Sequence, residues 1–555
     1  MFHISETINK NYRYLGLVAV IILGTVSIFG SGGGDGGIGA PPVITSVSPA
    51  QSSDSAVVTA LVTVQFSIDM EEASIDANSF TLVDNTMTAV TASNISYDVG
   101  TRIAIFEPSS DLESGMEYFA TLTTAVQDSA GNHPLSTNYV WSFRIAPTLV
   151  PVSLDSNGVY GNDASATPAI DQTGRYIVFV STNNLAPGIN TGGIAQIYRK
   201  DTMTGEVRIV STDNTGLIAA DGASTASVIS ADGRYIAFES SATNLVTGDT
   251  NGIPDVFLHD TQTTTTTRVS VATGGTQANG ASSAPVVSVD GRYIAFESSA
   301  TNLVTGDTNG IPDVFLHDTQ TTTTTRVSVA TGGAQANGAS SAPAISANGR
   351  YIAFQSTAPD LVTGDTNTVM DIFLHDTQTP STTSRVSVTT GGAEVNGASS
   401  DPAISADGRY IAFQSIASDL VAGDTNTVMD IFLHDTQTPS TSRVSITSGG
   451  AEANGASSAP AISGDGRYIA FQSAATDLIA TDTNGVTDIY LRDHQTPSTV
   501  RLSLSVGGAQ PTSESTQAAV SSDGRYVGFS SLANLDTAND TNGVRDIYRA
   551  HRTHQ

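Results

Sequence analysis

Six loops of the sequence carry the same polar triplet: an aspartate, an asparagine two positions later and a second aspartate four positions after that. The stretch GDTNGIPDVFLHD, residues 248–260, shows the pattern in full. A turn with two carboxylates, an amide oxygen and a backbone carbonyl supplies about half of the ~6 to 8 oxygen ligands that calcium takes. Calcium is therefore the candidate cofactor. The residues that would bind it are Asp249, Asn251, Asp255, Asp307, Asn309, Asp313, Asp365, Asn367, Asp371, Asp424, Asn426, Asp430, Asp482, Asn484, Asp488, Asp540, Asn542 and Asp546.

The same residues also fit a structural role. Aspartate and asparagine accept hydrogen bonds from backbone amides, and the glycine after the asparagine takes the left-handed position, so the loop can be an ordered turn without a ligand. Thr368 and Thr427 replace that glycine in two loops. The loop also lacks the third acidic position and the bidentate glutamate of an EF-hand. The sequence leaves a turn and a calcium site as alternatives.

Catalysis at these loops is a further alternative, but an active site needs one asymmetric arrangement, and the six loops are equivalent. The sequence contains no GxSxG, HExxH or Walker A motif. It therefore predicts no catalytic residues in the loops and a protein that is not an enzyme.

A long repeat must position the loops. The tripeptide Gly-Arg-Tyr recurs at spacings of 58 or 59 residues, and such a period indicates a repeat architecture. Each unit contains four strand-like runs, which in the fifth unit are residues 402–405, 409–415, 430–435 and 442–447. The Asp-Gly pair before Arg-Tyr predicts a two-residue hairpin turn, in which both residues need positive φ. Four strands per unit predict a β-propeller.

The strand count predicts how the ring closes. The chain stops after the third strand of the last unit, and residues 149–155, LVPVSLD, match the fourth strand of the other units. We expect a seven-bladed β-propeller in which residues 149–155 pair with the blade of residues 517–551, with the first strand of each blade innermost. Each Asp-x-Asn loop joins the second strand to the third. All six loops should then lie on one face, ringed by their carboxylates.

Two stretches resemble known families. The repeat words SADGRYIAFQS and SSDPAISADGRYIAF resemble the TolB-like, WD40-like (PD40-type) propeller repeat, across residues 148–555. Residues 41–147 contain alternating runs such as VTVQFS and RIAIFEP, typical of a β-sandwich. Their words ITSVSPA and YVWSFRIA resemble the bacterial Ig-like domain of the S-layer protein type, which implies a spacer or adhesion module. Trp141, in its last strand, is expected in the core.

Composition excludes several partners. The net charge of −30 and a pI near 4.3 argue against nucleic acid and against anionic lipid. Cations or basic groups are better candidates. The chain has no cysteine, so it has no disulfide, thiolate metal site or cysteine nucleophile.

The N-terminus predicts export. Lys10 and Arg13 precede an apolar run, residues 15–30, which is shorter than the ~20 residues that span a bilayer. Residues 1–30 are therefore an export signal or an N-terminal anchor, and residues 31–40 a glycine-rich linker. Their junction resembles a bacterial lipoprotein processing site, but Ser31 stands where that site has cysteine. Cleavage and retention both stay open. The expected location is periplasmic, cell-surface or secreted.

The sequence as a whole predicts a non-catalytic, monomeric binding or adhesion protein that presents its propeller to a protein or glycan ligand. The alternative is a propeller-based glycan lyase or hydrolase, with its site at the axial mouth. Its residues would be those that break the repeat in the first and last blades: Tyr160, Asn162, Arg199, Lys200, Arg545 and His551.

Overall fold

The computed structural model describes two bodies built from β-sheets. Its described residues run from 41 to 552, except for 52, 57–59, 85–86, 111, 113–116, 131–132, 146–148, 379, 480–481 and 507–508. The predicted export signal or anchor and the glycine-rich linker lie outside these residues. Within them, no helix is long and apolar enough to cross a bilayer.

The first body is a sandwich of two four-stranded sheets, in the orders β1-β3-β6-β5 and β2-β8-β7-β4. Both sheets contribute side chains to one hydrophobic core. Trp141 lies in that core, 1% exposed, and its indole Nε1 donates a hydrogen bond to the Pro49 carbonyl at 3.2 Å. The prediction that Trp141 is a core residue is confirmed. The elements are β1 (Ile44–Ser48), β2 (Ser53–Ala56), β3 (Val62–Phe66), η1 (Glu72–Ser74), β4 (Phe80–Asp84), β5 (Ala92–Asp98), β6 (Ile103–Pro108), β7 (Glu117–Leu122) and β8 (Tyr139–Ile145).

The second body consists of four-stranded antiparallel sheets, seven of them in the described residues, and the first six are each built from one repeat unit. The first three sheets are β10 (Ser165–Ile170), β11 (Tyr176–Ser181), β12 (Gln196–Asp201) and β13 (Val207–Ile209); β14 (Ser224–Ile229), β15 (Tyr235–Ser240), β16 (Asp255–Asp260) and β17 (Thr265–Arg268); and β18 (Ser282–Val287), β19 (Tyr293–Ser298), β20 (Asp313–Asp318) and β21 (Thr323–Arg326). The next three are β22 (Ser340–Ile345), β23 (Tyr351–Ser356), β24 (Asp371–Asp376) and β25 (Thr382–Arg385); β26 (Ser399–Ile404), β27 (Tyr410–Ser415), β28 (Asp430–Asp435) and β29 (Ser440–Arg443); and β30 (Ser457–Ile462), β31 (Tyr468–Ser473), β32 (Asp488–Asp493) and β33 (Ser498–Arg501).

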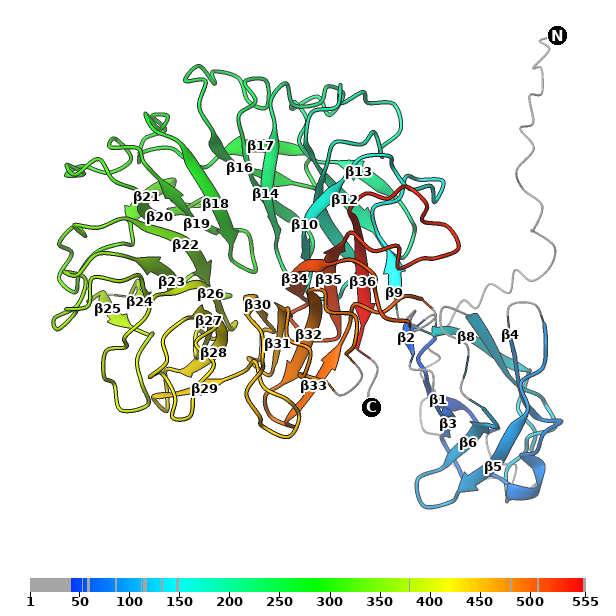
Figure 1. Cartoon of the computed structure of the whole chain (residues 1–555). Coiled ribbons are helices and arrows are strands. Elements are labelled where there is room, and N and C mark those ends of the chain that lie inside the picture. Colours follow the sequence, from blue (N-terminus) through cyan, green and yellow to red (C-terminus); the bar gives the residue numbers. More distant parts are fainter. Residues whose placement is uncertain are drawn as a thin grey trace, which may run out of the picture.

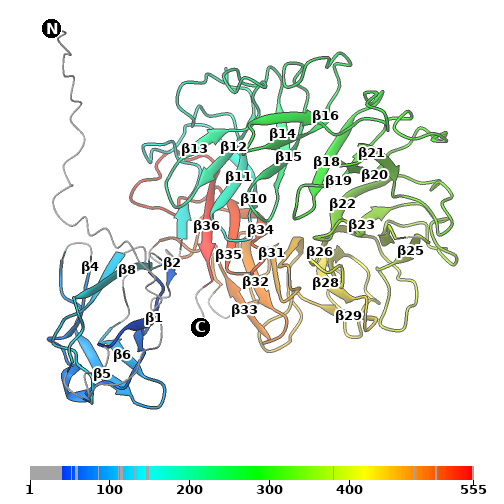
Figure 2. The same ribbon diagram turned by 180° about the vertical axis from the view of Figure 1, so that it is seen from behind.

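The last sheet closes the ring. It consists of β34 (Ser515–Val520), β35 (Tyr526–Ser531), β36 (Asp546–His551) and β9 (Leu149–Pro151), a strand from before the first sheet. The pairing of β9 with β36 therefore uses the segment that the strand count singled out. The first strands of neighbouring sheets contact one another around the whole ring, and β10 contacts β34. Figures 1 and 2 show the sheets radiating from these inner strands, from opposite sides.

The outer strand begins earlier than predicted. In the fifth sheet it was expected over residues 442–447, but β29 spans Ser440–Arg443. The strand ends there because the Ile431 amide donates to the Ser445 hydroxyl, at 3.0 Å, instead of to a backbone carbonyl. A side chain thus terminates the ladder.

The hairpin turn is also longer than the predicted two residues. In the second sheet the Gly233 amide donates to the Ser230 carbonyl at 2.9 Å, and the Ser230 amide donates to the Tyr235 carbonyl at 2.8 Å. Gly233 has a φ of 73°, whereas Asp232 is not at positive φ. The Asp232 carboxylate instead accepts hydrogen bonds from the Ser230 hydroxyl and the Arg234 amide. Of the Asp-Gly pair, only the glycine has a positive φ, so only the glycine is required by the backbone conformation of the turn.

The Gly-Arg-Tyr tripeptide forms the contact between neighbouring sheets. A Cβ added to Gly291 would lie 2.2 Å from Cδ2 of Tyr235, which belongs to the preceding sheet. The Arg234 guanidinium covers the same Tyr235 ring at 4.7 Å and is held by two hydrogen bonds to Asp260. The contact recurs around the ring, at Gly174–Tyr526, Gly233–Tyr176, Gly291–Tyr235, Gly349–Tyr293, Gly408–Tyr351, Gly466–Tyr410 and Gly524–Tyr468.

Replacing this glycine should cost far more than replacing a loop glycine of similar conformation. Gly291→Ala adds a clash with Tyr235 to the strain of a positive φ, whereas Gly306→Ala, at φ 86°, has no atom within 4 Å of its new Cβ. We expect Gly306→Ala to lower the free energy of unfolding by about 1 kcal/mol, and Gly291→Ala by a further ~1 to 3 kcal/mol from overpacking. Urea unfolding of both variants measures the difference, and equal losses would contradict the contact.

Candidate cation site

The Asp-x-Asn loops lie where predicted, each between the second and third strands of a sheet. In the second sheet the loop connects β15 to β16, and its final aspartate, Asp255, is the first residue of β16. All sheets have the same chain direction relative to the ring, so the six loops lie on one face. The Asn251 amide nitrogen donates to the Asp255 carboxylate at 2.9 Å, and its oxygen accepts from the Ile253 amide at 3.3 Å. The loop therefore orders itself through its own polar groups.

The carboxylates of the loops point inward. The side chains of Asp249 and Asp255 are 3% and 0% exposed, and their counterparts in the other sheets are similarly buried. The expected ring of surface carboxylates is thus wrong for these residues. Buried carboxylates need a compensating cation or a proton.

An arginine provides that cation in five of the loops. Nη1 of Arg268, the last residue of β17, lies 3.1 Å from Asp249 and 3.4 Å from Asp255. The sequence reasoning missed this residue, although its signal is present as the Arg-Val-Ser or Arg-Leu-Ser word that ends the outer strand. The arginines are Arg268, Arg326, Arg385, Arg443 and Arg501.

The first sheet indicates that the buried aspartates and the arginine depend on one another. Gln196 occupies the place of Asp255, since it pairs with Ser181 as Asp255 pairs with Ser240. Ile209 occupies the place of Arg268. Its loop, INTGGIAQ, also lacks the first aspartate. The carboxylates and the arginine are therefore absent together.

The closing sheet has the carboxylates without the arginine. Its outer strand is β9, and Pro151 faces Tyr548 where the second to sixth sheets have the arginine. Asp540 and Asp546 are 2% and 1% exposed. Asp546 accepts hydrogen bonds from Ser153 at 2.6 Å and Asn542 at 2.9 Å. Burial raises the pKa of Asp546 to about 6.

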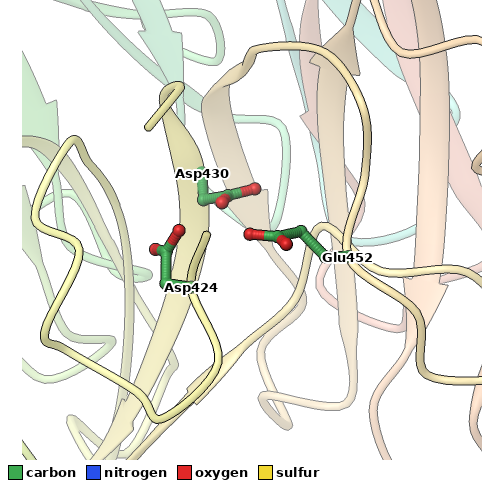
Figure 3. A group of neighbouring side chains, drawn as sticks. All are labelled: Asp424, Asp430 and Glu452. Atoms are coloured by element: carbon green, nitrogen blue, oxygen red, sulfur yellow. The ribbon is translucent and has the colours of Figure 1, made fainter. Parts of the chain in front are cut away.

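The fifth sheet brings a third carboxylate to its pair. Oxygen atoms of Asp424, Asp430 and Glu452 all lie within 4.8 Å of one another, and Figure 3 shows the three side chains converging. Arg443 Nη1 lies 2.7 Å from Glu452 and 3.0 Å from Asp430. Asp424 Oδ1 is buried, accepts no hydrogen bond and lies 3.5 Å from the same nitrogen. One guanidinium thus faces three carboxylates.

In the fourth sheet one guanidinium also contacts three carboxylates. Glu394 lies 2.9 Å from Arg385, beside Asp365 and Asp371. Burial, followed by the charge of Asp371, raises the pKa of Asp365 to about 6, whereas hydrogen bonds from Thr366 lower the pKa of Glu394 to about 2. The glutamates were missed by the sequence reasoning because other units have glutamine there. Those glutamines are Gln277, Gln335 and Gln510.

Five of the six residues that break the repeat contact different neighbours and form no common site. Lys200 Nζ donates to the Leu154 carbonyl at 3.1 Å, and Tyr160 donates to Asp536 at 3.2 Å. Arg545 pairs with Glu514, and His551 packs against the Tyr526 ring at 5.0 Å. Arg199 stacks on Tyr176, and Asn162 is exposed.

The strand order and inter-sheet contacts define a β-propeller that follows an Ig-like sandwich. The family model described as a bacterial Ig-like domain matches residues 39–145. Comparison with curated protein sequences gives no match.

Several solved structures resemble the chain. A putative TolB from Agrobacterium tumefaciens is 16% identical, with a TM-score of 0.34 over 62% of this chain and 94% of that one. An oligogalacturonate lyase in complex with manganese is 12% identical, with a TM-score of 0.45 over 73% and 97%. An acylaminoacyl peptidase from Pyrococcus horikoshii is 10% identical, with a TM-score of 0.37 over 66% and 49%.

The unpaired Asp546 should give the ring a pH-dependent stability. Its folded-state pKa of about 6 lies above the ordinary aspartate pKa of 3.8, so its contribution to stability is most favourable below pH 4 and is lost as the pH rises from about 4 to about 6. Asp546→Asn removes this dependence. The stability of the variant relative to the wild type should therefore rise by up to about 3 kcal/mol across that window. Denaturant unfolding at several pH values checks this, and a constant difference would contradict it.

Proposed function

We propose that the protein is an exported, non-catalytic binding protein, located in the periplasm, at the cell surface or outside the cell. In this proposal the Ig-like domain is a spacer. The propeller acts as a monomer and offers one face to a protein or glycan ligand. The repetition of equivalent groups on that face supports binding over catalysis, because one reactive centre would need a unique arrangement.

Three exposed carboxylates on that face carry the proposal. Asp360, Asp419 and Asp477 occupy equivalent positions in the loops of three successive sheets. Each accepts a hydrogen bond from a backbone amide, at 2.9 to 3.0 Å. Equivalent acidic groups repeated along a rigid surface suit an extended ligand with repeated cationic groups or with anionic groups bridged by calcium.

The chain itself offers a matched substitution. The second and third sheets have Asn244 and Asn302 at this position, and these accept the same backbone hydrogen bond at 3.0 Å. A variant with Asp360→Asn, Asp419→Asn and Asp477→Asn should therefore keep its fold. It should bind a ligand identified on a glycan array or from basic protein probes at least tenfold more weakly, with a smaller dependence on salt.

Unchanged affinity in the triple variant would overturn the assignment of this face. Turnover is measured on every ligand that binds. Hydrolysis or elimination of a bound glycan would overturn the non-catalytic proposal and favour the lyase or hydrolase alternative.

We also propose calcium as a ligand of the Asp-x-Asn loops, first at the Asp424, Asp430 and Glu452 group and its counterpart in the fourth sheet. Three carboxylates against one guanidinium leave a formal charge of −2, and their oxygens are hard donors of the kind that calcium takes. Calcium would have to displace the Arg443 guanidinium, since that nitrogen lies among the same oxygens. Metal and arginine thus compete for one place.

Thermal melting in millimolar calcium and in excess chelator tests this site. Calcium that binds only the native state adds about 1.4 to 2.7 kcal/mol at 10 to 100 times its Kd, so the melting temperature should rise. Replacing Glu394 and Glu452 by Gln, as in the sheets that have glutamine, should abolish most of the rise. Glu514→Gln, which changes a carboxylate paired with Arg545, should leave it intact. The absence of any calcium effect in the wild type would leave the loops as turns.

A further inference from the structure

A groove of about 320 Å³ runs beside the outer strand of the first sheet. Its lining includes the apolar residues Pro187, Ile189 and Val210, and the polar residues Arg199, His259, Glu206 and Arg208. A corresponding hollow between the second and third sheets is lined by Arg268 and His317. The two hollows differ in whether their arginine has an ion-pair partner.

Arg199 carries a charge that no carboxylate of the described residues neutralises by an ion pair. It stands where the second sheet has Leu258, as their pairing with Val178 and Ala237 shows. Its guanidinium stacks on the Tyr176 ring at 3.6 Å, and its Nε is shielded from solvent and donates no hydrogen bond. An arginine in this state is ready to bind an anion.

The nearby acidic groups are already committed. Asp201, two residues further along β12, accepts hydrogen bonds from Arg175 at 2.7 to 3.2 Å. Glu206 pairs with Arg208 at 2.7 Å. In the hollow between the second and third sheets, by contrast, Arg268 is paired with Asp249 and Asp255. Among the arginines that line these two hollows, Arg199 is the one without an acidic partner in the part of the chain that the structure describes.

The rest of the polar lining consists of the Glu206–Arg208 ion pair and the uncharged His259. His259 Nδ1 lies 3.0 Å from the Thr266 hydroxyl, and burial lowers the pKa of His259 to about 4. At neutral pH the imidazole is therefore an uncharged hydrogen-bonding group. Ile209, which replaces the arginine of the other sheets, extends the apolar wall.

We propose that this groove binds a small organic monocarboxylate with an apolar body. The carboxylate would meet the Arg199 guanidinium, and the body would cover Ile189 and Val210. A single negative charge fits better than two, because the net charge of −30 opposes the approach of a dianion. The site is separate from the Asp-x-Asn loops and does not rest on the function proposed above.

Binding of hexanoate to the full chain tests the proposal, with hexanamide as the uncharged analogue and glucuronate as a polar carboxylate. Saturation-transfer NMR or calorimetry at millimolar concentration should detect binding of hexanoate but not of hexanamide or glucuronate. Arg199→Leu introduces the residue of the second sheet and should weaken hexanoate about tenfold to hundredfold, since it removes a charge-assisted hydrogen bond. Arg199→Lys should retain part of the affinity.

Arg552→Leu is the matched control. Arg552 also stacks on a tyrosine, Tyr468, at 3.9 Å, but it does not line the groove. This variant should bind hexanoate as the wild type does. The proposal is overturned if the wild type does not bind hexanoate, if Arg199→Leu binds it equally well, or if glucuronate or hexanamide binds as tightly.

Discussion

The contact of a glycine with the tyrosine of the preceding sheet is the constraint on which the ring depends. Neighbouring sheets can approach this closely because Gly291 and its counterparts have no side chain that would clash with the ring of Tyr235 and its counterparts. Arg234, the residue before Tyr235, lies over the ring of the same tyrosine. Gly174 and Tyr526 make this contact between the first and last sheets. Each interface between neighbouring sheets therefore contains the same glycine–tyrosine contact.

The buried charges follow a second rule, which is visible by comparing the sheets within one chain. A buried ion pair with one member removed is strongly destabilising, so its members tend to appear and disappear together. The first sheet lacks them all, and the second to sixth sheets have both aspartates and the arginine. The closing sheet is the exception, because its outer strand is not part of its own repeat unit. There, burial raises the pKa of Asp546 to about 6, and its carboxylate accepts hydrogen bonds from Ser153 and Asn542 where the other pairs have a guanidinium.

The sequence predicted the strands and the closing segment well, because both depend on local pattern and on a regular period. It could not predict which way Asp249 and Asp255 face, since that depends on Arg268, which lies in a different strand. The prediction of a two-residue turn at the Asp-Gly pair was too short. The hairpin is closed by the backbone of Ser230, whose hydroxyl also orients Asp232. Arg199 was singled out as a break in the repeat, but its lack of an ion pair became visible only with its neighbours in place.

The closing strand has a mechanical consequence. The chain leaves the sandwich at β8 and enters the ring at β9, so tension between the two bodies is applied directly to the strand that completes the ring. β9 pairs with β36 alone, followed by the bonds of Val152 and Ser153 to Ile547 and Asp546. A force on the sandwich therefore acts on the β9–β36 pairing before it acts on any other sheet. The force that this pairing withstands limits the force that the whole propeller can bear.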